Sequence, residues 1–290
     1  MGPGKEKFAL ITGCGDGGIG HALANNFVQN GFIVIATLLP HESRTHLEHA
    51  KIHVVDLDVT KEDQMIPFKS TLEEITGGTL DVLVNNAGIC YTMTAADTDV
   101  KQVEKMFAVN VFGPMRLVHH LHRMLIAAPR GVIVNIGSIG GVCPYVFGAS
   151  YNATKAALHH WGNTLRVEMK PFGVHVVNII SGEVATNILK SDVRDNRTLP
   201  EDSVYAPLAQ LFRDHVNRTP DAMSPDDYAR GVVAMVQRRS LPAWFWHGNA
   251  TGFIWTLDSF FPRTIWVSTL NYLRLVSFSL RYIRTWRTPF

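Results

Sequence analysis

The sequence has few cysteines, no cluster of metal-ligating residues and no apolar signal region at its N-terminus. Its three cysteines, Cys14, Cys90 and Cys143, have no paired spacing and favour thiols in a reducing compartment. The 13 histidines have no convergent cysteine or carboxylate partners, so we expect no metal site. The N-terminus carries no apolar signal region, so we expect a cytoplasmic protein in which the sequons at Asn196 and Asn217 are incidental.

An excess of charge of one sign is also missing. The formal net charge is +2, and no basic stripe precedes residue 260. Proteins that bind nucleic acid concentrate basic residues to neutralise phosphates, so we expect no nucleic-acid partner. With 46% hydrophobic and 18% charged residues among 290, the composition is that of a globular protein with room for one large domain.

What the sequence does contain is an alternation of short apolar runs and helical patterns. The runs that predict strands lie at residues 8–12, 32–37, 53–55, 80–84, 132–136 and 174–180, and the patterns that predict helices lie at 19–29, 63–75, 100–126 and 150–169. Strands that alternate with helices of this length indicate a parallel sheet covered on both faces. We therefore expect an α/β fold with a Rossmann-type, doubly wound sheet of about seven strands, the seventh at residues 241–246.

The pattern changes after Gly182. Residues 183–223 are polar and without clear periodicity, which is typical of a lid or a binding loop. Ser224 then makes a good helix N-cap, with Pro225 at the first helical position. We expect residues 1–250 to form one domain that includes this lid, and residues 251–290 to form an apolar helical extension.

Glycines crowd the turn between the first predicted strand and the first helix. Five of the eight residues from Gly13 to Gly20 are glycine. Glycines there permit positive φ and close approach by a pyrophosphate, which the N–H groups at the start of the helix also attract. A plain turn is the alternative, but it would not need five glycines. The residues of this turn that we expect to bind a dinucleotide are Gly13, Gly15, Asp16, Gly18, Ile19 and Gly20.

A serine, a tyrosine and a lysine form the second group that carries chemistry. Tyr151 and Lys155 are four apart on a predicted helix and share a face. Ser138 follows the fifth strand, whose carboxyl end lines the ligand crevice of a doubly wound sheet. Hydride addition to a carbonyl builds negative charge on oxygen. A phenol whose pKa is lowered by a nearby ammonium can supply the proton, and a hydroxyl can hold the same oxygen. A tyrosine and a lysine at this spacing also occur by chance, so the combination with Ser138 and the glycine turn is what favours hydride transfer.

These motifs resemble those of the short-chain dehydrogenase/reductase family over roughly residues 6–248. The resemblance rests on the glycine turn, on Asn85-Asn-Ala-Gly88, and on the stretch from Tyr151 to Lys155 with Asn110 and Ser138. It implies a catalytic tetrad of Asn110, Ser138, Tyr151 and Lys155. In that tetrad Asn110 would anchor a water for proton relay, and Lys155 would also hold the nicotinamide ribose. For Asn110 the alternative is a polar residue that merely bends its helix.

The resemblance also assigns residues outside the glycine turn to the cofactor. They are Thr37 at the end of the second strand, Asp58 and Val59 near the adenine, Asn86, Ala87 and Gly88 near the adenosine ribose, Tyr151 and Lys155, and Val184 and Thr186 near the nicotinamide carboxamide and phosphate. Ser181-Gly182 departs from the family, which usually has Pro-Gly there, and the departure bears on the rigidity of that turn.

Residues 11–24 are similar to the acyl-dihydroxyacetone-phosphate reductase-like branch of the family. Members of that branch tend to use NADPH and to act on lipid-like or bulky ketones. We expect NADP(H) on this resemblance, with NAD(H) as the alternative, because the branch's usual arginine after the second strand is missing from residues 36–39, as is the aspartate of NAD-preferring relatives. Asp16 would disfavour a 2′-phosphate, whereas His41 or Arg44 would favour one.

The expected activity is the interconversion of a hydrophobic ketone and a secondary alcohol, with Tyr151 as general acid or base and a lipid-like, polyketide-like or terpenoid-like substrate. Apolar residues 142–147 would wall the substrate cleft. The alternatives are an NAD-dependent alcohol dehydrogenase, non-redox chemistry at the same site, and a cofactor-sensing regulator. A regulator of that kind should lack members of the tetrad, which is complete here.

The last part of the chain, residues 241–290, is rich in tryptophan, phenylalanine, leucine and isoleucine and is punctuated by arginines. A spanning helix needs about 20 mostly apolar residues, and the stretch 252–262 is too short. One interpretation is amphipathic helices within 251–290 that lie on the endoplasmic reticulum or on lipid droplets. The other is a helix over the substrate cleft or against a second subunit of a homo-oligomer.

Overall fold

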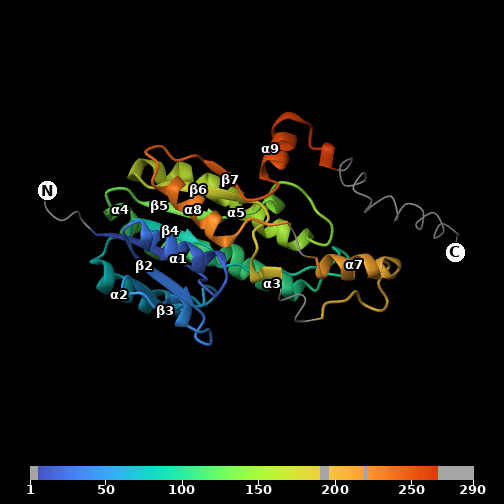
Figure 1. Cartoon of the computed structure of the whole chain (residues 1–290), viewed down its shortest axis with the longest axis horizontal. Coiled ribbons are helices and arrows are strands. Elements are labelled where there is room, and N and C mark those ends of the chain that lie inside the picture. Colours follow the sequence, from blue (N-terminus) through green and yellow to red (C-terminus); the bar gives the residue numbers. More distant parts are fainter. Residues whose placement is uncertain (1–5, 190–195, 219–220, 267–290) are drawn as a thin grey trace.

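Seven parallel strands form the sheet at the centre of the computed structural model, which describes residues 6–189, 196–218 and 221–266 (Figure 1). The strands are β1 (Lys7–Ile11), β2 (Phe32–Leu38), β3 (Ile52–Asp56), β4 (Val82–Asn85), β5 (Val132–Ile136), β6 (His175–Ser181) and β7 (Trp244–His247). Their order across the sheet is β3-β2-β1-β4-β5-β6-β7, so the direction of winding reverses between β1 and β4. The expected doubly wound sheet is confirmed, and its ligand crevice lies at this reversal.

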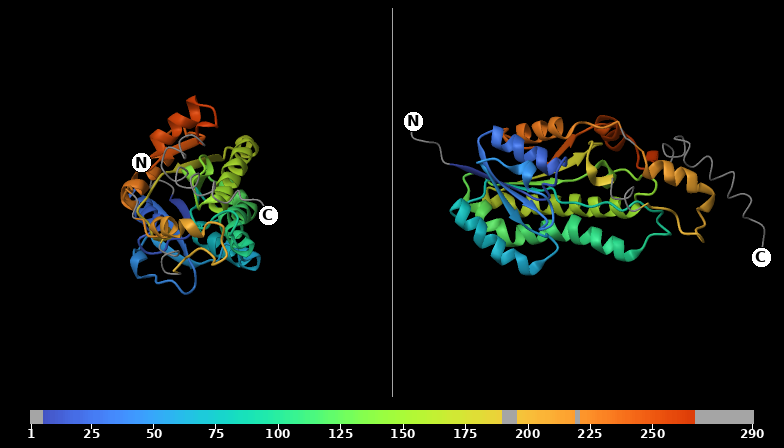
Figure 2. Two further views of the ribbon diagram at one scale, coloured as in Figure 1. Left: turned by 90° about the vertical axis from the view of Figure 1, so that its right-hand side faces the viewer. Right: turned by 60° about the horizontal axis from the view of Figure 1, so that its bottom comes forward.

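Helices cover both faces of the sheet (Figure 2). The helices of one face are α1 (Ile19–Gln29) and α8 (Pro225–Val236), and those of the other are α2 (Met65–Thr76), α4 (Gly113–Ala127) and α5 (Ala149–Met169). Successive residues of β1 show why two layers form, because Ala9 and Ile11 pack toward α1 and α8 while Phe8 and Leu10 pack toward the other face. The start of α8 is as predicted, since the Ser224 side chain accepts a hydrogen bond from the backbone N–H of Asp227.

The long helix predicted over residues 100–126 is interrupted. Its two parts, α3 (Val100–Phe107) and α4, are joined by a π-helical turn at Ala108–Phe112. Asn110 lies within this turn, and its amide is bound to the backbone of Ile89 after β4. Turns of this kind often occur at functional sites, because the extra residue re-aims a side chain.

Residues 183–223 are more regular than expected. The expectation of a segment without periodicity is wrong at α7 (Ala209–Val216). Phe212 and Val216, one turn apart, are buried there and pack with Phe147 from the loop before α5. Two apolar anchors on so short a helix are too few to produce a visible period.

The described chain ends beyond β7 with α9 (Thr251–Phe260), which stands outside the two helical layers (Figure 1). Ile254 of α9 packs with Trp266 and with Cys143 from the loop after β5. None of the described helices is both long and apolar enough to cross a bilayer. The part of the predicted extension from residue 267 to 290 lies outside the described residues.

Candidate active site

The glycine turn after β1 has the shape that a pyrophosphate site needs. Gly13 and Gly17 have φ of +68° and +67°, a region in which other residues are strained. No described side chain caps α1, and its described first turn holds no acid, so its N–H groups are left for a ligand. An ideal Cβ on Gly20 would lie 2.4 Å from the carbonyl oxygen of Gly13, so α1 can approach the turn only with glycine there.

A single cavity of about 1140 Å³ runs from this turn to Tyr151. All the predicted cofactor residues line it except Gly20, which packs beneath the turn. Pockets for one drug-sized molecule measure about 300–1,000 Å³, so this cavity has room for a dinucleotide with a second molecule beside it. The arrangement fits the cofactor that the motifs indicate.

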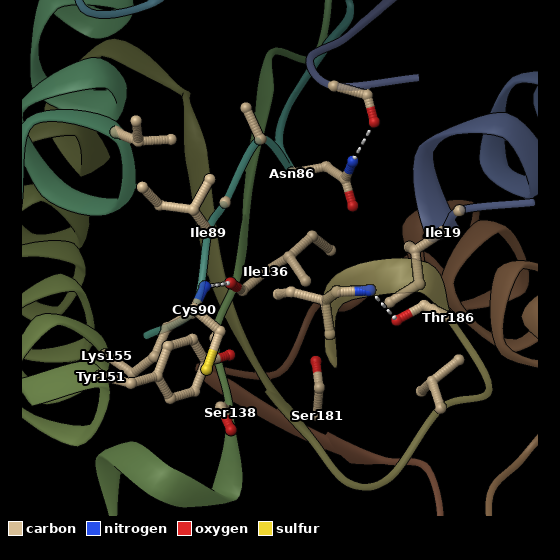
Figure 3. Close-up of a pocket in the computed structure, with 18 of the residues that line it drawn as sticks. Ile19, Asn86, Ile89, Cys90, Ile136, Ser138, Tyr151, Lys155, Ser181 and Thr186 are labelled. Carbon is tan, nitrogen blue, oxygen red and sulfur yellow. Dashed lines mark hydrogen bonds between the residues drawn. The ribbon is translucent and has the colours of Figure 1, made fainter. Parts of the chain in front are cut away.

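Ser138, Tyr151 and Lys155 meet at one end of the cavity, opposite Ile19 and Thr186 (Figure 3). The Lys155 Nζ lies 5.6 Å from the centroid of the Tyr151 ring and donates to the carbonyl oxygen of Ile136 at 2.8 Å. The Ser138 hydroxyl lies close enough to the Tyr151 phenol to lower the pKa of that phenol, and it accepts from the N–H of Gly140 at 3.0 Å. Three of the four predicted catalytic residues therefore converge on one space.

The expected lowering of the Tyr151 pKa by Lys155 is not what this arrangement produces. Burial raises the pKa of the Tyr151 phenol above its usual value, and the charge of Cys90 adds to the rise, while the nearby Ser138 hydroxyl opposes it. Burial also lowers the pKa of Lys155 to about 8. At neutral pH the phenol therefore keeps its proton, and most of the lysine remains an ammonium.

Asn110, the fourth predicted catalytic residue, is buried behind the cavity and does not line it. Its Oδ1 accepts from the N–H of Ile89 at 2.9 Å, and its Nδ2 donates to the carbonyl oxygen of Ile89 at 2.9 Å and to the Thr154 hydroxyl at 3.0 Å. Thr154 directly precedes Lys155 on α5. Asn110 thus connects the loop after β4 to the turn of α5 that carries Lys155. Its side chain therefore does more than bend its own helix, which was the alternative.

Glu42 is a residue of the cavity that sequence reasoning missed. Its carboxylate accepts from the N–H of Leu39 at 2.7 Å and lies beside Gly15, where the adenosine end of a dinucleotide would come. Arg44, which we expected to favour a 2′-phosphate, is paired instead with Asp56 at 2.6 Å. NAD-preferring relatives carry their acid at the end of the second strand, whereas this chain supplies one from the loop that follows β2.

The departure at Ser181-Gly182 has a local explanation. The Ser181 hydroxyl hydrogen-bonds the buried Tyr228 hydroxyl at 2.5 Å, which fixes the end of β6 without a proline. An ideal Cβ on Gly182 would lie 1.9 Å from the carbonyl oxygen of Asn249, so only glycine fits beside that backbone. The turn that leads to Val184 and Thr186 is therefore held in place.

Comparisons with known proteins identify the family of the chain. A sequence model described as short chain dehydrogenase matches residues 7–197, and the chain belongs to that family of oxidoreductases. It is 99% identical over 266 residues to a short-chain dehydrogenase of Pyricularia oryzae named RED1, covering 92% of this chain and 94% of that one.

A more distant relative supports the branch. The NADPH-dependent 1-acyldihydroxyacetone phosphate reductase of Schizosaccharomyces pombe is 39% identical over 226 residues, which is 77% of this chain and 76% of that protein. Among solved structures, the closed form of a serine dehydrogenase complexed with NADP+ superposes with a TM-score of 0.71 at 25% identity, covering 84% of this chain and 95% of that chain.

Proposed function

We propose that this chain is an NADP(H)-dependent oxidoreductase that interconverts a hydrophobic ketone and a secondary alcohol, with Tyr151 as the proton donor or acceptor. Residues 1–250 form the dinucleotide-binding and catalytic domain of this proposal. The observation that carries it is the meeting of the Ser138 hydroxyl, the Tyr151 phenol and the Lys155 ammonium in one cavity with the glycine turn.

The cofactor, when bound, supplies or accepts the hydride. In reduction the Tyr151 phenol gives its proton to the carbonyl oxygen, and the Ser138 hydroxyl holds that oxygen in place. The Lys155 ammonium stabilises the phenolate that Tyr151 leaves behind. Asn110 positions the turn of α5 that carries Lys155, and a water held there would complete the proton relay. A phenol that stays protonated at neutral pH suits the reductive direction.

Support for NADP(H) comes from the relatives, two of which are named for NADPH or for a complex with NADP+. The Glu42 carboxylate and the exposed Asp16 carboxylate act against it, because both lie near the glycine turn and would repel a 2′-phosphate. NAD(H) therefore remains the alternative, and direct comparison of the two cofactors decides between them.

The substrate end of the cavity favours a hydrophobic molecule. Its walls include Pro144 and Tyr145 from the loop before α5 and Phe253, Ile254 and Trp266 from the chain after β7. Val184, Thr186, His215 and Arg218 line the cavity from segment 183–223, which is the lid of the proposal. Bulky ketones are the substrates that such apolar walls would hold.

Turnover of a ketone panel tests the proposal. Purified protein is given NADPH or NADH with aliphatic and aryl ketones of increasing size, and loss of cofactor absorbance is followed. We expect turnover to rise with the apolar size of the ketone and to drop by about 10²–10³-fold in Ser138→Ala. Absence of turnover with every ketone and both cofactors would contradict the proposal, as would an unchanged rate in Ser138→Ala.

Peripheral membrane contact is part of the same proposal, carried by α9 and the residue after it. Phe253, Trp255, Phe260 and Phe261 are 60%, 44%, 69% and 48% exposed there. Large exposed aromatic residues on a short helix favour a lipid surface of the kind found on endoplasmic reticulum or lipid droplets. We expect the full chain to sediment with phosphatidylcholine vesicles, and Phe260→Ser with Phe261→Ser to weaken that binding. If the wild-type chain stays in the supernatant, the membrane proposal is contradicted, and the partner of α9 would be a second copy of the chain. A molecular mass in solution that rises with protein concentration would then show this self-association.

A further inference from the structure

His159 lies on α5, one helical turn beyond Lys155, and the loop that carries Ser138 wraps around its ring. The side chain is 3% exposed. An ideal Cβ on Gly137 would lie 2.1 Å from the His159 Nε2, and one on Gly141 would lie 2.5 Å from its Cε1. The ring therefore fills the space that these two glycines leave open, directly beneath Ser138.

A hydrogen bond joins the ring to the backbone of Ser138, whose N–H donates to the His159 Nε2 at 3.2 Å. Because Nε2 accepts, the ring proton of neutral His159 is on Nδ1. That Nδ1 is buried and has no hydrogen-bond partner among the described residues. Burial, with the charge of Lys155, lowers the pKa of His159 to about 3, so the ring stays neutral and Nε2 stays an acceptor at neutral pH.

The backbone of His159 is fixed as well. Its carbonyl oxygen accepts from the Asn178 Nδ2 at 2.8 Å, and the Oδ1 of Asn178 accepts from the Asn135 Nδ2 at 3.0 Å. Asn178 is on β6 and Asn135 on β5, so this buried chain of amides ties α5 to the sheet at His159. The backbone of His159 is thus held rigidly by the sheet, while its imidazole binds the loop that carries Ser138.

We propose that His159 is a positioning residue, whose imidazole holds the Ser138 backbone so that the serine hydroxyl meets the Tyr151 phenol and the substrate oxygen. Three hydrogen bonds then fix Ser138: its N–H donates to His159, its Oγ accepts from the N–H of Gly140, and its carbonyl oxygen accepts from the N–H of Gly141. A side chain that packs equally well but accepts no hydrogen bond would let the loop shift. The consequence for rate rests on the proposed function, whereas the restraint on the loop does not.

Three variants separate positioning from packing. His159→Leu puts an apolar side chain of similar size in place of the ring and removes the acceptor. His159→Gln restores an acceptor oxygen, and His160→Leu changes the exposed neighbour as a matched control. We expect kcat to fall about 10- to 100-fold in His159→Leu, since small misplacements of a catalytic group cost that much. The glutamine variant should recover part of that loss, the control should match wild type, and the Kd for the cofactor should change less than about twofold in all three.

A double-mutant cycle shows whether His159 acts through Ser138. In the Ser138→Ala background, His159→Leu should lower kcat less than about twofold, because the group that it positions is already gone. The same fold-loss in both backgrounds would overturn the proposal and leave His159 as a packing residue.

Hydrogen exchange of the loop tests the restraint without relying on turnover. The peptide that covers residues 137–141 should exchange faster in His159→Leu than in wild type or His160→Leu, in protein that remains folded by circular dichroism. Exchange that does not change would overturn the proposal even if kcat falls. A wild-type protein without turnover would contradict the proposed function, and this measurement would still decide the role of His159.

Discussion

Gly162→Ala tests the buried chain of amides formed by Asn135 and Asn178 under the active site. The expected loss of stability follows from the structure. Gly162 lies in α5 against the sheet, where an ideal Cβ would be 2.2 Å from the Asn178 Oδ1 and 2.7 Å from the Asn135 Nδ2. Alanine by itself favours a helix by about 1 kcal/mol over glycine. Here it must displace Asn178, whose buried hydrogen bonds to Asn135 and to the His159 carbonyl cost about 1–3 kcal/mol each when lost. Overpacking adds to that cost, so we expect a net destabilisation of about 2–5 kcal/mol.

Gly252→Ala is the matched control, because it makes the same change in a helix where no described atom lies within 4 Å of the ideal Cβ. It should be neutral or stabilising by up to about 1 kcal/mol. Urea unfolding, followed by far-ultraviolet circular dichroism, measures both free energies of unfolding. The reasoning is refuted if Gly162→Ala unfolds at the same urea concentration as wild type, or if the two variants shift together.

Three further predictions follow from the site. Because burial lowers the pKa of Lys155 to about 8, its ammonium is present below that pH and lost above it. Reductive kcat/KM should therefore be level below about pH 8 and fall at higher pH. A kcat/KM that stays level well above about pH 8 contradicts the role of the lysine charge. Tyr228→Phe leaves the Ser181 hydroxyl without its buried partner and should cost about 1–3 kcal/mol in urea unfolding, so an unchanged midpoint would show that this bond does not hold the turn. Glu42→Gln removes a negative charge beside Gly15 and should lower the KM for NADPH more than that for NADH; an equal effect on both would place the adenosine end elsewhere.

The sheet was predictable because each central strand is a continuous apolar run between turn residues. Val132–Ile136 has the predicted bounds, and α1 begins and ends where its pattern does. The glycine turn and the spacing of Tyr151 and Lys155 are local signals, and the residues that they indicated, apart from Gly20, line the same cavity.

Interactions between distant residues were not predictable from local patterns. The π-helical turn at Asn110 depends on the backbone of Ile89, which is 21 positions away. In the sequence, nothing distinguishes His159 from the other histidines on helices. Only the fold shows that Gly137 and Gly141 surround its ring. Glu42 reaches the cavity only because its loop folds back over Gly15. The raised pKa of Tyr151 follows from burial, which the sequence does not show directly.

Tyr151→Phe is the most direct test of the account, because it removes one hydroxyl oxygen and leaves the walls of the cavity in place. NADPH binding is measured by the change in its fluorescence, and turnover is measured with the best ketone of the panel. The account predicts that the cofactor binds with nearly the wild-type Kd while turnover is lost. Turnover that survives the substitution would contradict Tyr151 as the proton donor and, with it, the proposed chemistry of the site.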